Sequence, residues 1–170
     1  QPQELVEYAR EKSDIIMPNI KESISYIRSI DPNNLQVWIN EALSEPFYVR
    51  KYIDYIDITG MDYYPIITQT NNDRFYPWRS TRDIGRVGFF TDRYKEIGRG
   101  KPVWMVLQAF SYSELGSNWA NQPVALPSFN ESRYMAYIAL THGVRGIFYY
   151  GSNTLKSEEC RQSIYSLTSE

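Results

Sequence analysis

The chain has 170 residues, of which 42% are hydrophobic and 22% are charged, and its formal net charge is −2. These proportions are typical of soluble globular proteins and exclude a disordered or fibrous chain, while the scattered basic residues exclude nucleic acid as a partner. The longest apolar run, around Pro102 to Leu107, is far shorter than the roughly 20 residues of a membrane span, so we expect none.

Two helical patterns occupy the beginning of the chain. Glu4 to Ser13 is amphipathic, and this first helix is expected to end before Pro18. A second helix is predicted from Asn19, which forms a capping-box pattern with Glu22. Isoleucines then recur at helical spacing and mark one face of this second helix.

The first predicted strand follows an Asp-Pro-Asn-Asn turn. Residues 35–39 are rich in β-forming residues and end at Asn40 and Glu41. A short helical segment at residues 47–55 then leads to a second strand at residues 56–65. The end of that strand carries polar and aromatic side chains.

The second half of the chain continues the alternation of helix and strand. A helical pattern at residues 84–97 precedes a nearly continuous apolar strand at 102–108, as in parallel sheets that are buried on both faces. A capping box at residues 128–131 opens another helix, residues 144–150 form the fourth predicted strand, and Ser157 begins a final helix. This alternation predicts an α/β fold with four parallel strands and crossover helices.

Four strands are half of a (β/α)8 TIM barrel, which has eight strands and about 250 residues. We expect residues 1–170 to be the C-terminal half of a single TIM-barrel catalytic domain whose upstream half is missing, since the chain opens on Gln1 rather than Met. An isolated half would expose two sheet edges, so poor solubility or association is expected, and the oligomeric state is left open. The competing topology is a small open doubly wound sheet.

Four segments carry a resemblance to a known family. Residues 30–37 (IDPNNLQV) and 56–65 (IDITGMDYYP) are similar to strands five and six of catalytic barrels, although the usual Arg-Pro pair of strand five is absent. Residues 101–110 (KPVWMVLQAF) look like a strand seven that ends in Gln, and residues 131–150 resemble the passage from helix seven to strand eight. Together they resemble the glycoside hydrolases, of the broad group that contains the β-galactosidases.

The resemblance implies a glycosidase that hydrolyses an oligo- or polysaccharide by carboxylate acid-base chemistry when full length, the fragment alone being inactive. Strand seven of this group usually ends in the nucleophilic Glu, where this chain has Gln108, and the general acid of strand four would precede Gln1. The alternative is a non-catalytic carbohydrate-binding barrel that has lost its strand-seven nucleophile. A third possibility is an open-sheet interaction domain without a sugar site, so whether the chain is an enzyme is left open.

Glycoside hydrolysis needs two carboxyl groups that flank the scissile bond. Asp62 at the end of the second strand and Glu41 directly after the first are the candidate catalytic residues, each with a purely structural alternative as a capping or exposed loop residue. The chain contains fifteen Tyr, seven Phe and four Trp, and aromatic rings stack on the apolar faces of sugars. The predicted substrate-binding residues lie at strand ends or in the loops that follow: Asn40, Tyr64, Gln108, Trp119 and Tyr150.

Four other residues bear on this site. Trp78 is a further candidate for sugar stacking, and Glu114 is a further carboxylate in the loop after the third strand. Trp38 and Trp104 lie inside predicted strands, so we expect them in the core.

Other chemistries are set aside. His142 is the only histidine, so neither a Ser-His-Asp triad nor a multi-histidine metal site can be built from this span. Cys160 is the only cysteine, and the Gly98-Arg99-Gly100 sequence precedes its strand rather than following it, which is the wrong end for nucleotide binding. We predict a carbohydrate substrate and no cofactor or metal. The cellular location is left open, with a secreted or periplasmic protein as the working expectation.

Overall fold

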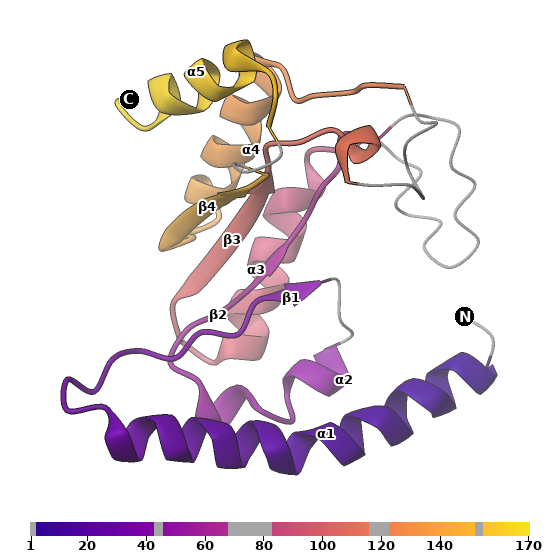
Figure 1. Ribbon diagram of the computed structural model, residues 1–170, viewed down its shortest axis with the longest axis vertical. Coiled ribbons are helices and arrows are strands. Elements are labelled where there is room, and N and C mark those ends of the chain that lie inside the picture. The colour runs from indigo at the N-terminus through magenta and orange to yellow at the C-terminus, as the bar shows by residue number, and fades with distance from the viewer. Residues whose placement is uncertain (1–2, 43–45, 68–82, 116–122, 152–154) are drawn as a thin grey trace.

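The structure is a computed structural model that describes residues 3–42, 46–67, 83–115, 123–151 and 155–170 (Figure 1). Its strands are β1 (Glu41–Ala42), β2 (Thr59–Asp62), β3 (Val103–Gln108) and β4 (Gly146–Tyr150). Its helices are α1 (Gln3–Ile30), α2 (Pro46–Val49), η1 (Ile53–Tyr55), α3 (Arg86–Gly98), η3 (Tyr112–Glu114), α4 (Phe129–Thr141) and α5 (Glu158–Leu167). None of these described helices combines the length and the apolar character that crossing a membrane requires.

The four strands form one parallel sheet in the order β1-β2-β3-β4, which confirms the predicted α/β class with parallel strands. Neighbours in the sheet are consecutive in the chain. A doubly wound sheet instead reverses its strand order at a switch point, and no reversal occurs among the described strands. The sequential order is that of a sheet wound in one direction.

Helices α3 and α4 cover one face of this sheet and lie behind it in Figure 1. Because successive strand residues point to opposite faces, Val103, Met105 and Leu107 of β3 all belong to the core beneath these helices. Trp104, Val106 and Gln108 point to the other face, away from α3 and α4. The sheet therefore has a helix-covered face and an open face.

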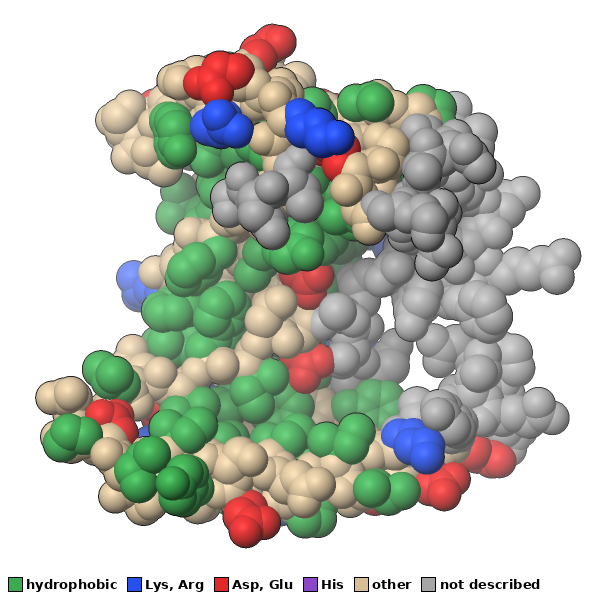
Figure 2. Space-filling model, in the orientation of Figure 1, with side chains coloured by type: hydrophobic (Ala, Val, Ile, Leu, Met, Phe, Trp, Pro, Cys, Tyr) green, Lys and Arg blue, Asp and Glu red, His purple; other side chains and the backbone are tan. Residues whose placement is uncertain are grey.

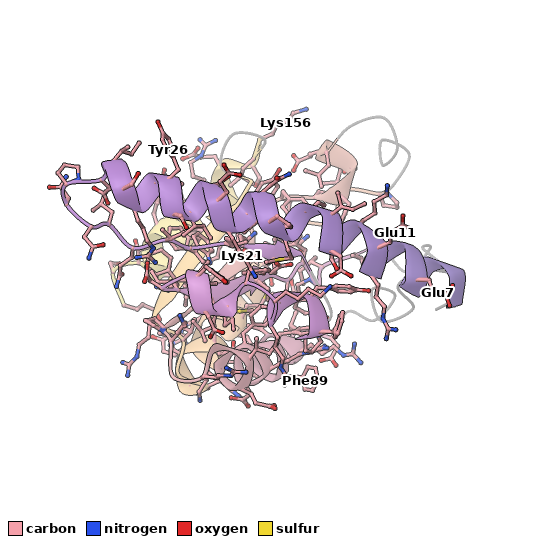
Figure 3. All side chains as sticks on the ribbon, turned by 90° about the horizontal axis from the view of Figure 1, so that it is seen from below. Glu7, Glu11, Lys21, Tyr26, Phe89 and Lys156 are labelled. Carbon is pink, nitrogen blue, oxygen red and sulfur yellow. The ribbon has the colours of Figure 1, made fainter. Side chains whose placement is uncertain are left out.

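Helix α1 corrects the sequence analysis, which predicted a break before Pro18. The structure has one helix that continues through Pro18 and runs along one side of the molecule (Figure 3). Proline inside a helix costs about 3 kcal/mol because it removes a backbone hydrogen bond. Met17 and Ile24 pack into the core on both sides of Pro18, and the ammonium of Lys51 lies 2.5 Å from the carboxylate of Asp14 in the preceding turn. Tertiary contacts thus hold the helix together across the proline.

Most of the remaining element predictions are confirmed, with shifted boundaries at the N-terminal end. The capping box at Ser128 is formed in both directions with Glu131, and Ser157 caps α5. The first strand is the poorest match. Residues 41–42 form the ladder with β2, whereas the predicted residues 35–39 contribute only an isolated bridge at Trp38. The predicted helix at 47–55 is split into α2 and η1.

Candidate functional site

A cleft of about 720 Å³ lies on the open face of the sheet, toward the carboxyl ends of the strands. Figure 2 looks at this face, where hydrophobic side chains gather over the strands. All four strand regions and the loop that holds η3 contribute to it. Its described lining is Trp38, Asn40, Asp62, Tyr64, Val106, Tyr112, Leu115, Phe148, Tyr149 and Tyr150.

Asp62 is the carboxylate of this lining and has hydrogen-bond donors from two strand regions. The side-chain amide of Asn40 donates to Asp62 Oδ1 at 3.4 Å, and the hydroxyl of Tyr64 forms a side-chain hydrogen bond with Asp62. Burial, together with the charge and hydrogen bond of Asp62, raises the pKa of Tyr64 well above its ordinary value of 10.0. Tyr64 is therefore a protonated donor at neutral pH.

Aromatic rings form one wall of the cleft. The rings of Tyr64 and Tyr150 stack with centroids 5.7 Å apart, and Phe110 meets both edge-on at 4.9 and 5.5 Å. The hydroxyl of Tyr112 donates to the backbone carbonyl of Tyr64 at 3.3 Å. Tyr150 is 49% exposed, so the open side of its ring is available to a ligand.

A second aromatic cluster lies nearer the amino ends of the strands. Trp38, Trp104 and Phe148 have ring centroids 5.1 to 5.2 Å apart. Glycine at position 146 makes room for them, because a Cβ there would lie 2.5 Å from the indole of Trp104. Trp38 was expected in the core, yet it is only half-buried and lines the cleft.

Gln108 ends β3, as the sequence predicted, but its side chain does not line the cleft. Gln108 is fully buried, and its amide nitrogen donates to the carbonyls of Ile66 and Phe110 at 2.9 Å each. Its amide oxygen accepts the backbone N–H of Ile66 at 2.8 Å. The substrate contact expected of Gln108 does not fit this geometry, because its donors and acceptor already bind the backbone.

Glu41 also lies elsewhere than expected. It follows Asn40 in the strand and points to the opposite face, where its carboxylate accepts a hydrogen bond from the hydroxyl of Tyr52. Glu114 closes a capping box in η3 by accepting the N–H of Ser111 at 2.9 Å. Neither carboxylate is among the residues of the cleft.

The structure thus brings together Asn40, Asp62, Tyr64 and Tyr150 of the predicted site. The predictions for Trp78 and Trp119 lie outside the described residues. Six residues of the lining were not predicted for the site: Trp38, Val106, Tyr112, Leu115, Phe148 and Tyr149. Strand alternation could have indicated Phe148, which is two residues before Tyr150 on the same strand.

The single histidine and the single cysteine of the chain both lie outside the cleft. The Nδ1 atom of His142 lies 2.7 Å from a carboxylate oxygen of Asp92, at the end of α4. Burial raises the pKa of the Cys160 thiol above its ordinary value. Within the described part of the chain, no three His, Cys, Asp or Glu side chains are grouped as metal ligands.

No protein-family model matches the chain, and no curated protein matches it. Among solved structures, the chain is similar to a β-galactosidase from the psychrophilic Marinomonas ef1, with a TM-score of 0.63 and 15% sequence identity. The match covers 92% of this chain and 26% of that protein. The chain therefore has a fold similar to part of a glycosidase, and it spans about a quarter of the length of the structure that it resembles.

Proposed function

We propose that the chain is the C-terminal half, strands five to eight, of a (β/α)8 barrel of the glycoside hydrolase type. The barrel binds an oligo- or polysaccharide at the carboxyl ends of its strands and hydrolyses it by carboxylate acid-base chemistry. The observation that carries the proposal is the position of Asp62, which lies between the donors Asn40 and Tyr64 in a cleft lined by aromatic rings.

The barrel interpretation is supported by the strand order and by the open face. In a (β/α)8 barrel the strands follow chain order, the helices lie outside, and the active site lies at the carboxyl ends of the strands. The described strands are consecutive, and α3 and α4 cover one face only. Strands β1 and β4 each pair on one side, so their other edges are available to strands four and one of an upstream half.

Exposed isoleucines on α1 agree with a missing neighbour. Ile15, Ile16, Ile27 and Ile30 are between 47% and 61% exposed. An upstream barrel half would bury such a surface. A dye that binds apolar surface, such as ANS, should fluoresce strongly with residues 1–170 alone and much less with the complete barrel. Equal fluorescence would contradict the half-barrel proposal.

The cleft suits a sugar by shape and chemistry. Its volume lies within the range of roughly 300 to 1,000 Å³ that is usual for ligand sites. Tyr150 offers an exposed ring face to the C–H side of a pyranose, while Asn40 and Asp62 offer a donor and an acceptor to its hydroxyls.

Asp62 is proposed as one carboxylate of the reaction. Two hydrogen-bond donors stabilise its negative charge, which fits a base, a nucleophile or a ligand of a sugar hydroxyl better than a proton donor. Hydrolysis requires a second carboxyl group across the scissile bond, and Asp62 is the sole carboxylate among the described lining residues. We therefore assign the general acid to the upstream half of the barrel.

The test is the release of reducing sugar from a panel of glycans by the complete barrel. Asp62→Asn should lower kcat by at least about 100-fold, the scale of a lost general acid or base, and leave the fold intact. Asp54→Asn makes the same change at an exposed position on η1 and should leave kcat unchanged.

Two other outcomes are informative. Binding of a glycan without any turnover would favour the alternative, a non-catalytic carbohydrate-binding barrel. Absence of both binding and turnover across the panel would contradict a sugar site altogether.

A further inference from the structure

Gln108 holds the chain segment that follows β2. The last backbone hydrogen bond from this end of β2 to β3 runs from Tyr63 N–H to the carbonyl of Val106 at 3.1 Å. Beyond it, the side chain of Gln108 takes the place of a strand backbone, because it bonds both the N–H and the carbonyl of Ile66. The segment is therefore fixed on both sides of Tyr64.

The surroundings of Gln108 require a group that both donates and accepts. Its side chain is fully buried, with the carbonyl oxygens of Ile66 and Phe110 at 2.9 Å from its nitrogen. An ionised Glu has acceptors only, so it could accept the Ile66 N–H but would place a negative charge against two carbonyl oxygens. A neutral amide satisfies all three backbone groups.

We propose that Gln108 is a positioning residue, which sets the backbone after β2 and so the placement of Tyr64 in the cleft, and that this position requires an amide. It is not a nucleophile converted to its amide. The link to ligand binding rests on the proposed function, whereas the requirement for an amide can be tested without any sugar.

The first test compares Gln108→Glu with the wild-type protein by thermal unfolding over a range of pH. At about pH 7.5 the variant should lose roughly 10 °C in Tm, the scale of an unpaired buried charge in a chain of this size. Burial raises the pKa of the new carboxyl above its unfolded value of about 4.3. The decrease in Tm therefore has its full size above the folded pKa, where the carboxyl is ionised, and becomes smaller toward pH 4. A protonated carboxyl regains a donor.

Gln108→Met is the matched variant without a charge. It keeps the side-chain length but makes none of the hydrogen bonds, so its loss in Tm should be the same at both pH values. A Gln108→Glu variant within about 2 °C of wild type at neutral pH would overturn the proposal, because a buried charge must cost more. A gain of glycoside turnover in that variant would also overturn it, since position 108 would then be a lost nucleophile.

Hydrogen exchange of the Ile66 amide distinguishes a local effect on the segment after β2 from a loss of global stability. It uses Gln108→Met, so it tests the proposal even if Gln108→Glu does not fold. In Gln108→Met this amide should exchange about 100-fold faster while the β3 amides keep their protection. Thr91→Val removes another buried hydrogen bond, from Thr91 Oγ1 to the carbonyl of Val87 on α3, and should leave Ile66 protected. Unchanged exchange of Ile66 in Gln108→Met would contradict the positioning role.

Discussion

The helix-covered face and the open face of the sheet use the same strands in different ways. On β3, Val103, Met105 and Leu107 are at most 1% exposed beneath α3 and α4. On β4, Ile147 and Tyr149 are half-buried against the same core, whereas Phe148 and Tyr150 of the open face are 42% and 49% exposed. Alternation along a strand therefore separates side chains that stabilise the fold from side chains that are available to a ligand. Substitutions on the two faces should therefore have different consequences.

The largest loss is expected on the helix-covered face. Leu107→Ala should lower the free energy of unfolding by about 3 to 4 kcal/mol, because it removes buried methyl groups and leaves a cavity. Phe148→Ala removes a larger side chain from the open face and should cost less than about half of that, since much of the ring is already in contact with water. Urea unfolding measures the free energy of unfolding of both variants, and equal losses would contradict the difference between the two faces.

Gly60→Ala should show that the open face also has a position at which no side chain is tolerated. A Cβ at Gly60 would lie 1.7 Å from the backbone oxygen of Trp104 on the neighbouring strand, so the strands must shift. We expect a loss of about 3 kcal/mol, the upper range for overpacking. Gly85→Ala is the control, because the nearest atom there is a flexible Asp83 oxygen at 3.2 Å, and urea unfolding should find it close to wild type.

A smaller, pH-dependent loss is expected at Asp57, which joins α1 to the beginning of β2. Its carboxylate accepts hydrogen bonds from Arg28 and from the N–H of Val37 at 2.8 to 3.0 Å. Burial raises the pKa of Asp57, but the bonds from Val37 and Arg28 outweigh it and lower the pKa below the ordinary 3.8. Because the folded pKa is lowered, this stabilisation is present above the unfolded pKa and is lost as the pH falls through the folded pKa.

Asp57→Asn should therefore cost about 1 kcal/mol near pH 7, a modest value because the pair is partly exposed to solvent. The difference from wild type should begin to narrow below about pH 4, where the carboxyl of the unfolded chain becomes protonated, and should be lost as the pH falls through the lowered folded pKa of Asp57. Urea unfolding at both pH values measures it, and a difference that stays constant would exclude the charge of Asp57 as its cause.

The smallest effect on stability is expected at Tyr150. Tyr150→Ala should change the free energy of unfolding by less than about 1 kcal/mol, because half of the side chain is exposed. It should nevertheless weaken the binding of the best glycan of the panel by about 10-fold, through loss of a stacking partner. Calorimetry on the complete barrel measures the affinity, and unchanged binding would remove Tyr150 from the proposed site.

Local sequence signals predicted much of the fold. The Ser128 and Glu131 capping box, the apolar run of β3 and the end of β4 each depend on residues close together in the chain, and the structure has all three. The predicted break before Pro18 is wrong because the contacts that stabilise α1 on both sides of the proline come from core residues far along the chain. Propensity gives way to tertiary packing at such a position.

The sequence predicted those residues of the site whose position depends only on their place at the end of a strand. Asn40, Asp62, Tyr64 and Tyr150 follow from the rule that the carboxyl ends of parallel strands meet. The direction of a side chain at a strand end depends instead on its distant partners. Glu41 is bound to Tyr52 and Gln108 to the backbone of Ile66, and neither partner could be read from the neighbouring sequence.

The two glycines beside Trp104 restrict the sequence in different ways. At Gly146 a side chain would meet the indole ring, whereas at Gly60 it would meet the main chain. Positions 104 and 146 should therefore co-vary among related proteins, a larger residue at one accompanying a smaller residue at the other. Position 60 should remain glycine whatever residue occupies position 104, because every residue type has the same carbonyl oxygen.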